Sequence, residues 1–189
     1  MLFRSEAGLD FLGFDDTKPL LMVVGGSLGA AAVNTAVWGA LSELLKDFNI
    51  VHLVGKGKGD ESVQAEGYRQ FEYISKEMPD LFAAADIIVS RAGANAIFEF
   101  VALKKPNLLI PLGTAASRGD QILNAESFAR HGYSKVLLQD NLTPESLIRE
   151  IRALFADPAP YITAMAASPQ ANAVEKIVDA IEETIRAKA

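Results

Sequence analysis

Three glycines stand close together in the segment MVVGGSLGAAAVN, between an apolar stretch and an alanine-rich stretch. Gly25 and Gly26 end the apolar stretch, Ser27 adds a hydroxyl group, and Gly29 precedes residues with helical spacing. Glycine lets the backbone approach a ligand closely, and the free N–H groups at a helix N-terminus attract anions. The segment therefore predicts a phosphate-binding loop, while turn geometry alone is the simpler alternative explanation for the glycines.

The spacing of these glycines does not match the usual nucleotide motifs. A dinucleotide loop has the pattern Gly-x-Gly-x-x-Gly and an acidic residue about 20 residues later. Here the pattern is Gly-Gly-x-x-Gly, and the second apolar stretch ends HLVGKGKG without an acid. The segment GKGKGDES also lacks the Gly-Lys-Ser/Thr sequence of a Walker loop, so we expect a flexible lysine-bearing loop there. Nicotinamide and flavin are disfavoured, and we predict no cofactor.

A second candidate segment, DIIVSRAGANAIFEF, also combines a strand end with a helix start. Arg91 ends the strand, Gly93 opens a turn, Ala94 and Asn95 begin the helix, and Glu99 interrupts its apolar residues. Two helix N-termini at one edge of a sheet suit a diphosphate. An unpaired buried carboxylate is costly, so Glu99 is expected to be exposed, paired with Arg91 or a lysine, or bonded to ligand hydroxyl groups.

A third segment, PLGTAASRGDQILNAESF, places polar residues at the start of another helix. Gln121 and Asn124 are three residues apart and share a helix face, where their amides suit neutral hydroxyl and acetamido groups. Asp120 has a simpler explanation, because the helix dipole favours an acid in the first turn.

The sequence offers no evident catalytic residue. His52 lies within an apolar strand and His131 precedes a glycine at a helix end, so both are expected to be structural. A Gly-x-Ser-x-Gly elbow and a His/Glu metal cluster are both missing from the sequence. We therefore predict a binding site without a catalytic base or a metal site.

Short apolar runs alternate with amphipathic segments along the chain, which positions the three loops. Strands are predicted at 20–25, 50–55, 86–90, 107–111 and 134–139, with a weaker one at 71–75, and helices at 29–47, 78–85, 94–104, 120–131, 144–156 and 173–187. This alternation is typical of an α/β fold: a Rossmann-like, doubly wound parallel sheet of about six strands with helices on both faces. Residues 1–19 are expected to form a lead-in helix or linker, and residues 20–189 one domain.

Composition limits the partners. The 189 residues carry a formal net charge of −6, which argues against nucleic-acid binding, and the chain has no cysteine. The sequence has neither a signal peptide pattern nor about 20 consecutive apolar residues, so we expect a soluble, cytoplasmic protein.

Taken together, the three segments closely resemble the C-terminal half of the MurG family, within glycosyltransferase family 28. These bacterial enzymes transfer N-acetylglucosamine from UDP-GlcNAc to lipid I, which gives lipid II for peptidoglycan. The resemblance covers residues 18–187 and implies one of the two Rossmann-like domains of a GT-B glycosyltransferase, an inverting hexosyltransferase whose C-terminal domain binds the nucleotide sugar.

The resemblance also implies roles for individual residues. The Gly25-Gly26-Ser27-x-Gly29 loop would contact the donor diphosphate, and Glu99 would bond the ribose hydroxyl groups. Gln121 would reach the sugar, with Asp120 and Asn124 beside it, and the backbone of Ile74 would lie against uracil. Two positions depart from the family pattern: Asp120 replaces a frequent glutamine, and Ala96 stands where a hydroxyl residue can occur.

The family's N-terminal half carries its acceptor site, its usual catalytic base and its membrane contact, and none of its motifs occurs in this sequence. We therefore expect weak UDP-sugar binding and negligible transfer by this chain, and a complete enzyme that is peripheral on the cytoplasmic face of the inner membrane. The alternatives are the donor domain of another GT-B enzyme, such as a glycolipid synthase or a two-chain dolichol-pathway transferase, and a non-catalytic nucleotide-binding module.

Overall fold

The computed structural model describes residues 6–26, 29–113 and 119–169. Its strands are β1 (Leu20–Val24), β2 (Asn49–Leu53), β3 (Tyr68–Phe71), β4 (Ile87–Ser90), β5 (Asn107–Leu109) and β6 (Lys135–Val136). Its helices are α1 (Glu6–Leu12), α2 (Ala31–Leu44), α3 (Met78–Ala84), α4 (Ala94–Ala102), α5 (Asp120–Arg130), α6 (Pro144–Ala156) and α7 (Ala159–Ala166), with a short 3-10 helix η1 (Gln139–Asn141).

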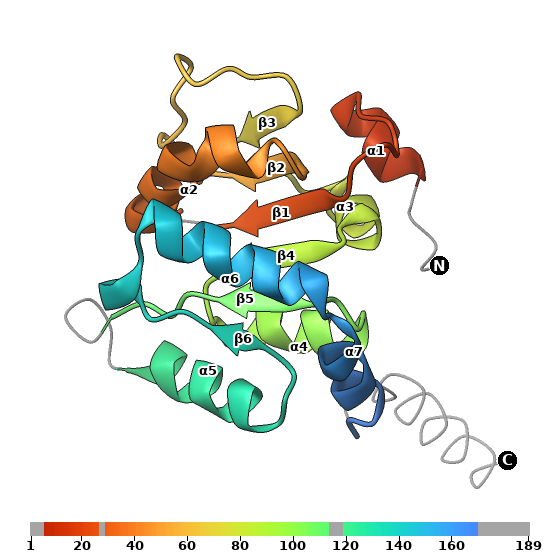
Figure 1. Ribbon diagram of the computed structural model, residues 1–189, viewed down its shortest axis with the longest axis vertical. Helices are drawn as coiled ribbons and strands as arrows, with labels where there is room; N and C mark the ends of the chain where they lie inside the picture. The colour runs from red at the N-terminus through yellow and green to blue at the C-terminus, as the bar shows by residue number, and fades with distance from the viewer. Residues whose placement is uncertain (1–5, 27–28, 114–118, 170–189) are drawn as a thin grey trace, which may run out of the picture.

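The six strands form one parallel sheet in the order β3-β2-β1-β4-β5-β6. The chain leaves β1 toward β2 on one side and leaves β4 toward β5 on the other, as Figure 1 shows. The connections from the two central strands therefore diverge at their carboxyl ends, where Val24 pairs with Ser90. Such a divergence point is where open parallel sheets bind ligands. The predicted doubly wound α/β fold is confirmed.

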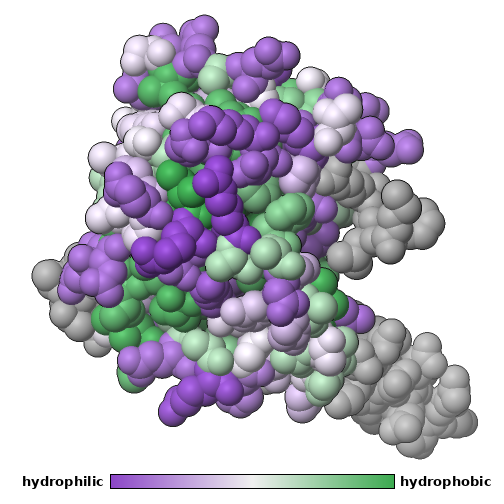
Figure 2. Space-filling model, in the orientation of Figure 1, coloured by the Kyte–Doolittle hydropathy of each residue, from purple (hydrophilic) through white to green (hydrophobic). Residues whose placement is uncertain are grey.

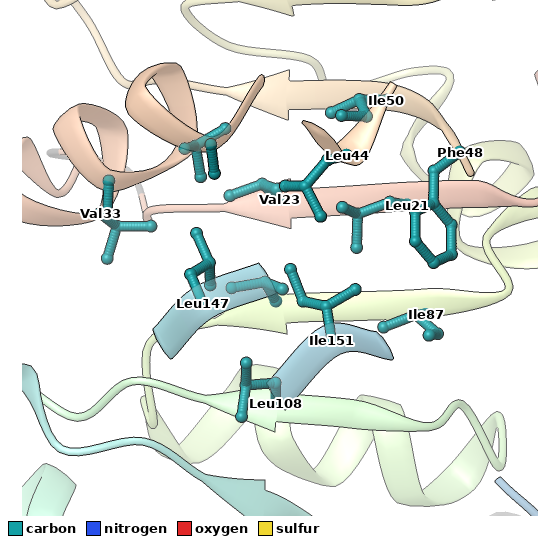
Figure 3. Packing of buried hydrophobic residues seen from close by; sticks show 14 of the residues in the cluster. Leu21, Val23, Val33, Leu44, Phe48, Ile50, Ile87, Leu108, Leu147 and Ile151 are labelled. Carbon is teal, nitrogen blue, oxygen red and sulfur yellow. The ribbon is translucent and has the colours of Figure 1, made fainter. Parts of the chain in front are cut away.

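Helices cover both faces of the sheet. Side chains of α2 and α6 pack on one face, and those of α1, α3, α4, α5 and α7 pack on the other. Along β1 the residues alternate: Leu21 and Val23 lie beneath α2 and α6 (Figure 3), whereas Leu20 and Met22 belong to the opposite cluster. Burying each of these side chains stabilises the fold by about 1.5–3 kcal/mol. A strand buried on both faces explains the continuous apolar run in the sequence.

The outer surface over α2 and α6 is polar. Figure 2 shows hydrophilic side chains gathered on this face, with apolar patches between them. Arg152 of α6 pairs with Asp47, which follows α2, at 2.7 Å. Both side chains are more than two-fifths exposed, so the ion pair contributes at most about 1 kcal/mol. The two helices are therefore held to the sheet chiefly by their buried faces.

Some predicted elements differ from the observed ones. The weak strand predicted at 71–75 begins too late in the sequence, because β3 is Tyr68–Phe71. Ile74 belongs to the loop after β3, and its apolar side chain is buried there. The lead-in segment forms α1, whose Leu9 and Leu12 join the core beside α3. Helix α7 was not predicted, and the predicted helix at 173–187 lies outside the described residues.

Candidate functional site

The loop after β1 is folded tightly against the neighbouring loop. A Cβ on Gly29 would lie 2.1 Å from the carbonyl oxygen of Val54, and Gly29 has a φ of +66°, so a larger residue would be both blocked and strained. A Cβ on Gly25 would lie 2.8 Å from the nitrogen of Ala30. Gly26 accepts a hydrogen bond from the N–H of Gly29 at 2.9 Å. Ser27 lies outside the described residues. Gly25 and Gly29 therefore leave no room for a side chain between the end of β1 and the start of α2.

The loop after β4 leaves empty space around Gly93. Gly93 precedes α4 with φ −72° and ψ 136°, an extended conformation that any residue adopts, and a Cβ there would meet no described atom within 4 Å. Gly29 and Gly93 therefore have different backbone conformations, but Gly93 precedes a second helix N-terminus at the same edge of the sheet, as predicted. Its missing side chain instead leaves open space before α4, where Ala94 and Asn95 are exposed.

The helices α2, α4 and α5 begin at the edge of the sheet where the strands have their carboxyl ends, and none of the three has a side-chain cap from the described part of the chain. Ala30, Gly93 and Gly119 precede α2, α4 and α5, and none of these residues has a side chain that could accept a hydrogen bond from the first turn. By contrast, the side chain of Thr143 caps α6 by accepting a hydrogen bond from the N–H of Ser146 at 3.1 Å. Within the described residues no side chain caps α2, α4 or α5, so these helix N-termini make the edge suitable for an anion.

Arg91 and Glu99 do not form the ion pair that was considered from the sequence. The Arg91 guanidinium is buried and donates to the carbonyl oxygens of Ile110 and Pro111, at 3.0 and 3.3 Å, and to Oε1 of Gln139 at 2.7 Å. Burial lowers the pKa of Arg91 because desolvation disfavours the charged form. Arg91 thus joins the ends of β4 and β5 to η1, and its group faces protein acceptors.

Glu99 is exposed on α4, because the helix packs through Ile97, Phe100 and Val101 while its neighbour Phe98 is 46% exposed. Within the described ranges its carboxylate forms no ion pair with Arg91 or with a lysine. Of the three environments expected for Glu99, exposure is the observed one. The carboxylate is available to a ligand.

Helix α5 is tied to both neighbouring loops by its amide residues. Oε1 of Gln121 accepts from the N–H of Leu112 at 3.0 Å, and Nδ2 of Asn124 donates to the carbonyl oxygen of Ala92 at 3.1 Å. Within the described residues, the Gln121 amide nitrogen and the Asn124 amide oxygen have no hydrogen-bond partner, and Asp120 is exposed in the first turn. The structure therefore brings the second and third predicted segments together.

Ile74 lies beyond the end of β3, with its side chain only 5% exposed. No backbone hydrogen bond of Ile74 to the described part of the chain is present. A buried side chain with unpaired backbone groups can present those groups to a planar, hydrogen-bonding ring.

The lysine-bearing loop after β2 contributes a residue that sequence reasoning missed. Nζ of Lys58 donates to the carbonyl oxygen of Gly29 at 3.3 Å, so the loop reaches the glycine loop. The Gln70 side chain of β3 contacts the end of this loop by donating to the carbonyl oxygens of Asp60 and Val63. The alternation of glycine and lysine in GKGKG was the only signal in the sequence.

Both histidines have structural roles, as predicted. His52 is fully buried with both ring nitrogens hydrogen-bonded, to Tyr68 at 3.0 Å and to Asn34 at 3.1 Å. His131 ends α5 and its Nδ1 lies 2.7 Å from the carbonyl oxygen of Ser127. Among the described residues there is no group of three or more potential metal-binding side chains, and no helix long and apolar enough to span a membrane.

Comparisons with known proteins agree with this geometry. The model of the glycosyltransferase family 28 C-terminal domain matches residues 20–183. The UDP-N-acetylglucosamine--N-acetylmuramyl-(pentapeptide) pyrophosphoryl-undecaprenol N-acetylglucosamine transferase of Lachnospira eligens is 54% identical over 184 residues, which are 97% of this chain and 52% of that protein. The transferase 2 of the same name from Bacillus cereus is 52% identical over 179 residues, 94% of this chain and 51% of that protein.

A crystal structure of MurG from Acinetobacter baumannii aligns with 95% of this chain and 54% of its own, with a TM-score of 0.69 and 26% identity. This likeness confirms the fold as one half of a GT-B glycosyltransferase. The chain spans about half the length of the curated relatives it matches. With a family model matched along most of its length, the chain belongs to glycosyltransferase family 28, as a C-terminal domain of that family.

Proposed function

We propose that this chain is the donor-binding domain of an N-acetylglucosaminyltransferase that uses UDP-GlcNAc and acts on lipid I. The observation that carries the proposal is the group of three uncapped helix N-termini, of α2, α4 and α5, at the divergence point of β1 and β4. Free N–H groups on several helices suit a ligand with more than one phosphate. The names of the relatives at 54% and 52% identity, which are N-acetylglucosamine transferases, support UDP-GlcNAc as the nucleotide sugar.

The donor would lie across this edge in parts. The diphosphate would contact the loop of Gly25, Gly26 and Gly29 and the first turn of α4 after Gly93. Exposed Glu99 would accept hydrogen bonds from the ribose hydroxyl groups.

The remaining parts of the donor would meet the other two segments. The free amide groups of Gln121 and Asn124, with Asp120 beside them, would bind the sugar. The backbone of Ile74 would pair with uracil. Arg91 would act indirectly, since its guanidinium holds the loops that follow β4 and β5.

Transfer would be a direct displacement with inversion. The acceptor hydroxyl gives its proton to a base, its oxygen forms a bond to the anomeric carbon, and the bond from that carbon to UDP breaks. Negative charge that builds on the departing UDP is stabilised by the helix N-termini. We propose that the base, the lipid I site and the contact with the cytoplasmic face of the membrane belong to a part of the enzyme outside these 189 residues, since the relatives are about twice as long.

Calorimetric titration of the chain with UDP-GlcNAc, UDP-GalNAc, UDP-glucose and UDP tests the proposal. The Glu99→Gln variant should bind UDP about tenfold more weakly, because a charge-assisted hydrogen bond is lost. The loss of affinity caused by Glu99→Gln should be smaller for 2′-deoxy-UDP than for UDP, because 2′-deoxy-UDP lacks one of the two ribose hydroxyl groups. Glu126→Gln, on the exposed side of α5, is the matched control and should bind like the parent.

Two results would contradict different parts of the proposal. If Glu99→Gln binds UDP as tightly as the parent chain does, Glu99 does not bond the ribose hydroxyl groups. Failure of the parent chain to bind any of the four nucleotides would remove the donor-binding function itself.

A further inference from the structure

The loop between β2 and β3 lies directly against the glycine loop that follows β1. The carbonyl oxygen of Val54 occupies the space that a Cβ of Gly29 would need, and Nζ of Lys58 donates to the carbonyl oxygen of Gly29 at 3.3 Å. Residue 29 stands two positions before the first residue of α2. The Lys58 ammonium therefore lies beside the N-terminus of α2.

This position of Lys58 is held by the loop itself. The N–H of Lys58 donates to the carbonyl oxygen of Gly55 at 3.1 Å, and Gly55 and Gly57 have φ angles of +91° and +68° that favour glycine. Further along, Oε1 of Gln70 accepts from the N–H of Asp60 at 3.2 Å. Lys58 is half-buried, whereas Lys56 in the same loop is exposed.

The charge of Lys58 is not matched by a nearby acid in the described ranges. The Asp60 carboxylate, two residues further on, accepts hydrogen bonds from the N–H and hydroxyl group of Ser62. An ammonium group has three N–H donors, and the carbonyl oxygen of Gly29 takes one of them. A cation with two remaining donors and the uncapped N-terminus of α2 thus lie on the same short stretch of backbone.

From this geometry we propose that Lys58 is a diphosphate-binding residue of the donor site. The inference rests on the proposed function, since it needs a nucleotide diphosphate in the crevice. Lys58 would pair with phosphate oxygens of the bound donor and would offset the charge that stays on UDP when the sugar leaves.

The test compares uridine, UMP and UDP by calorimetric titration of the parent, Lys58→Met, Lys58→Arg and Lys56→Met. Methionine keeps much of the length of lysine but loses its charge, and arginine keeps a charge. Lys58→Met should weaken UDP binding about tenfold, weaken UMP binding less, and leave uridine binding unchanged. Lys58→Arg should recover most of the UDP affinity, and Lys56→Met should match the parent.

The outcomes separate this inference from the proposed function. If Lys58→Met weakens uridine and UDP equally, Lys58 only supports the loop and the proposal is wrong. Unchanged UDP affinity in Lys58→Met, or an equal loss in Lys56→Met, also overturns it. If the parent chain binds none of the three compounds, the donor-binding function fails first. Thermal unfolding of each variant establishes that the fold is intact.

Discussion

At the scale of single residues, the core contains a chain of hydrogen bonds with one consistent direction. Nδ2 of Asn34 donates to the carbonyl oxygen of Val54, so its Oδ1 is the acceptor for Nε2–H of His52. Nδ1 of His52 then accepts from the hydroxyl group of Tyr68, which itself accepts from the indole N–H of Trp38. His52 is therefore neutral, and the network ends at Val54, the residue that packs against Gly29.

Burial of His52 makes stability depend on pH. Desolvation lowers the pKa of His52 from 6.5 to about 3, so the unfolded chain takes up a proton at a higher pH than the folded chain does. The contribution of neutral His52 to the free energy of unfolding is complete above pH 6.5 and is lost as the pH falls toward 3. Urea unfolding at pH 7, 5 and 4 should show a loss on the order of a few kcal/mol.

Variants identify the source of this loss. His52→Gln should be less stable than the parent at pH 7 but should lose less stability on acidification. His131→Gln should keep the parental pH dependence, since His131 lies on the exposed end of α5. An identical pH dependence in His52→Gln and the parent would show that other groups cause the effect.

At the scale of elements, the contrast between α6 and the three uncapped helices leads to a prediction at Gly93. Its extended backbone and empty surroundings allow a side chain, so Gly93→Asp should fold normally and cap α4. The cap and its charge at the helix N-terminus should keep stability unchanged or raise it by up to about 1 kcal/mol. The same carboxylate should repel the diphosphate and reduce UDP binding at least tenfold.

Thermal unfolding and UDP titration of Gly93→Asp measure the two effects separately. Thr143→Ala, which removes the cap of α6, is the control for a capping change away from the site and should lose about 1 kcal/mol without losing UDP affinity. Parental UDP binding by Gly93→Asp would mean that the N-terminus of α4 does not face the phosphates.

The elements themselves were largely predictable, because buried parallel strands give continuous apolar runs that alternate with helical spacing. The rule that ligands bind where the connections of a parallel sheet diverge then predicted that the loops after β1 and β4 lie at the same site. The roles of Arg91 and Lys58 were not predictable, since they depend on contacts with residues 19 and 29 positions away in the sequence. Ile74 misled the placement of β3 because a buried apolar residue in a loop has the same pattern as one in a strand.

At the scale of the whole molecule, the chain is expected to bind donor without transferring sugar. It spans about half the length of its relatives, and its described residues offer only structural histidines. Incubation of the 189-residue chain with UDP-GlcNAc and lipid I should give no lipid II above the level without protein. Measurable lipid II would place the acceptor site and the base within this chain.

The open N-termini of α2, α4 and α5 also link the folding equilibrium to the supply of ligand. A ligand that completes these helix ends binds the native state and not the unfolded chain, so at 100 times its dissociation constant it adds about 2.7 kcal/mol to the free energy of unfolding. The native population would then rise and fall with the nucleotide-sugar concentration. Without bound donor, the chain would unfold more often than the donor-bound chain, and proteases would degrade it faster.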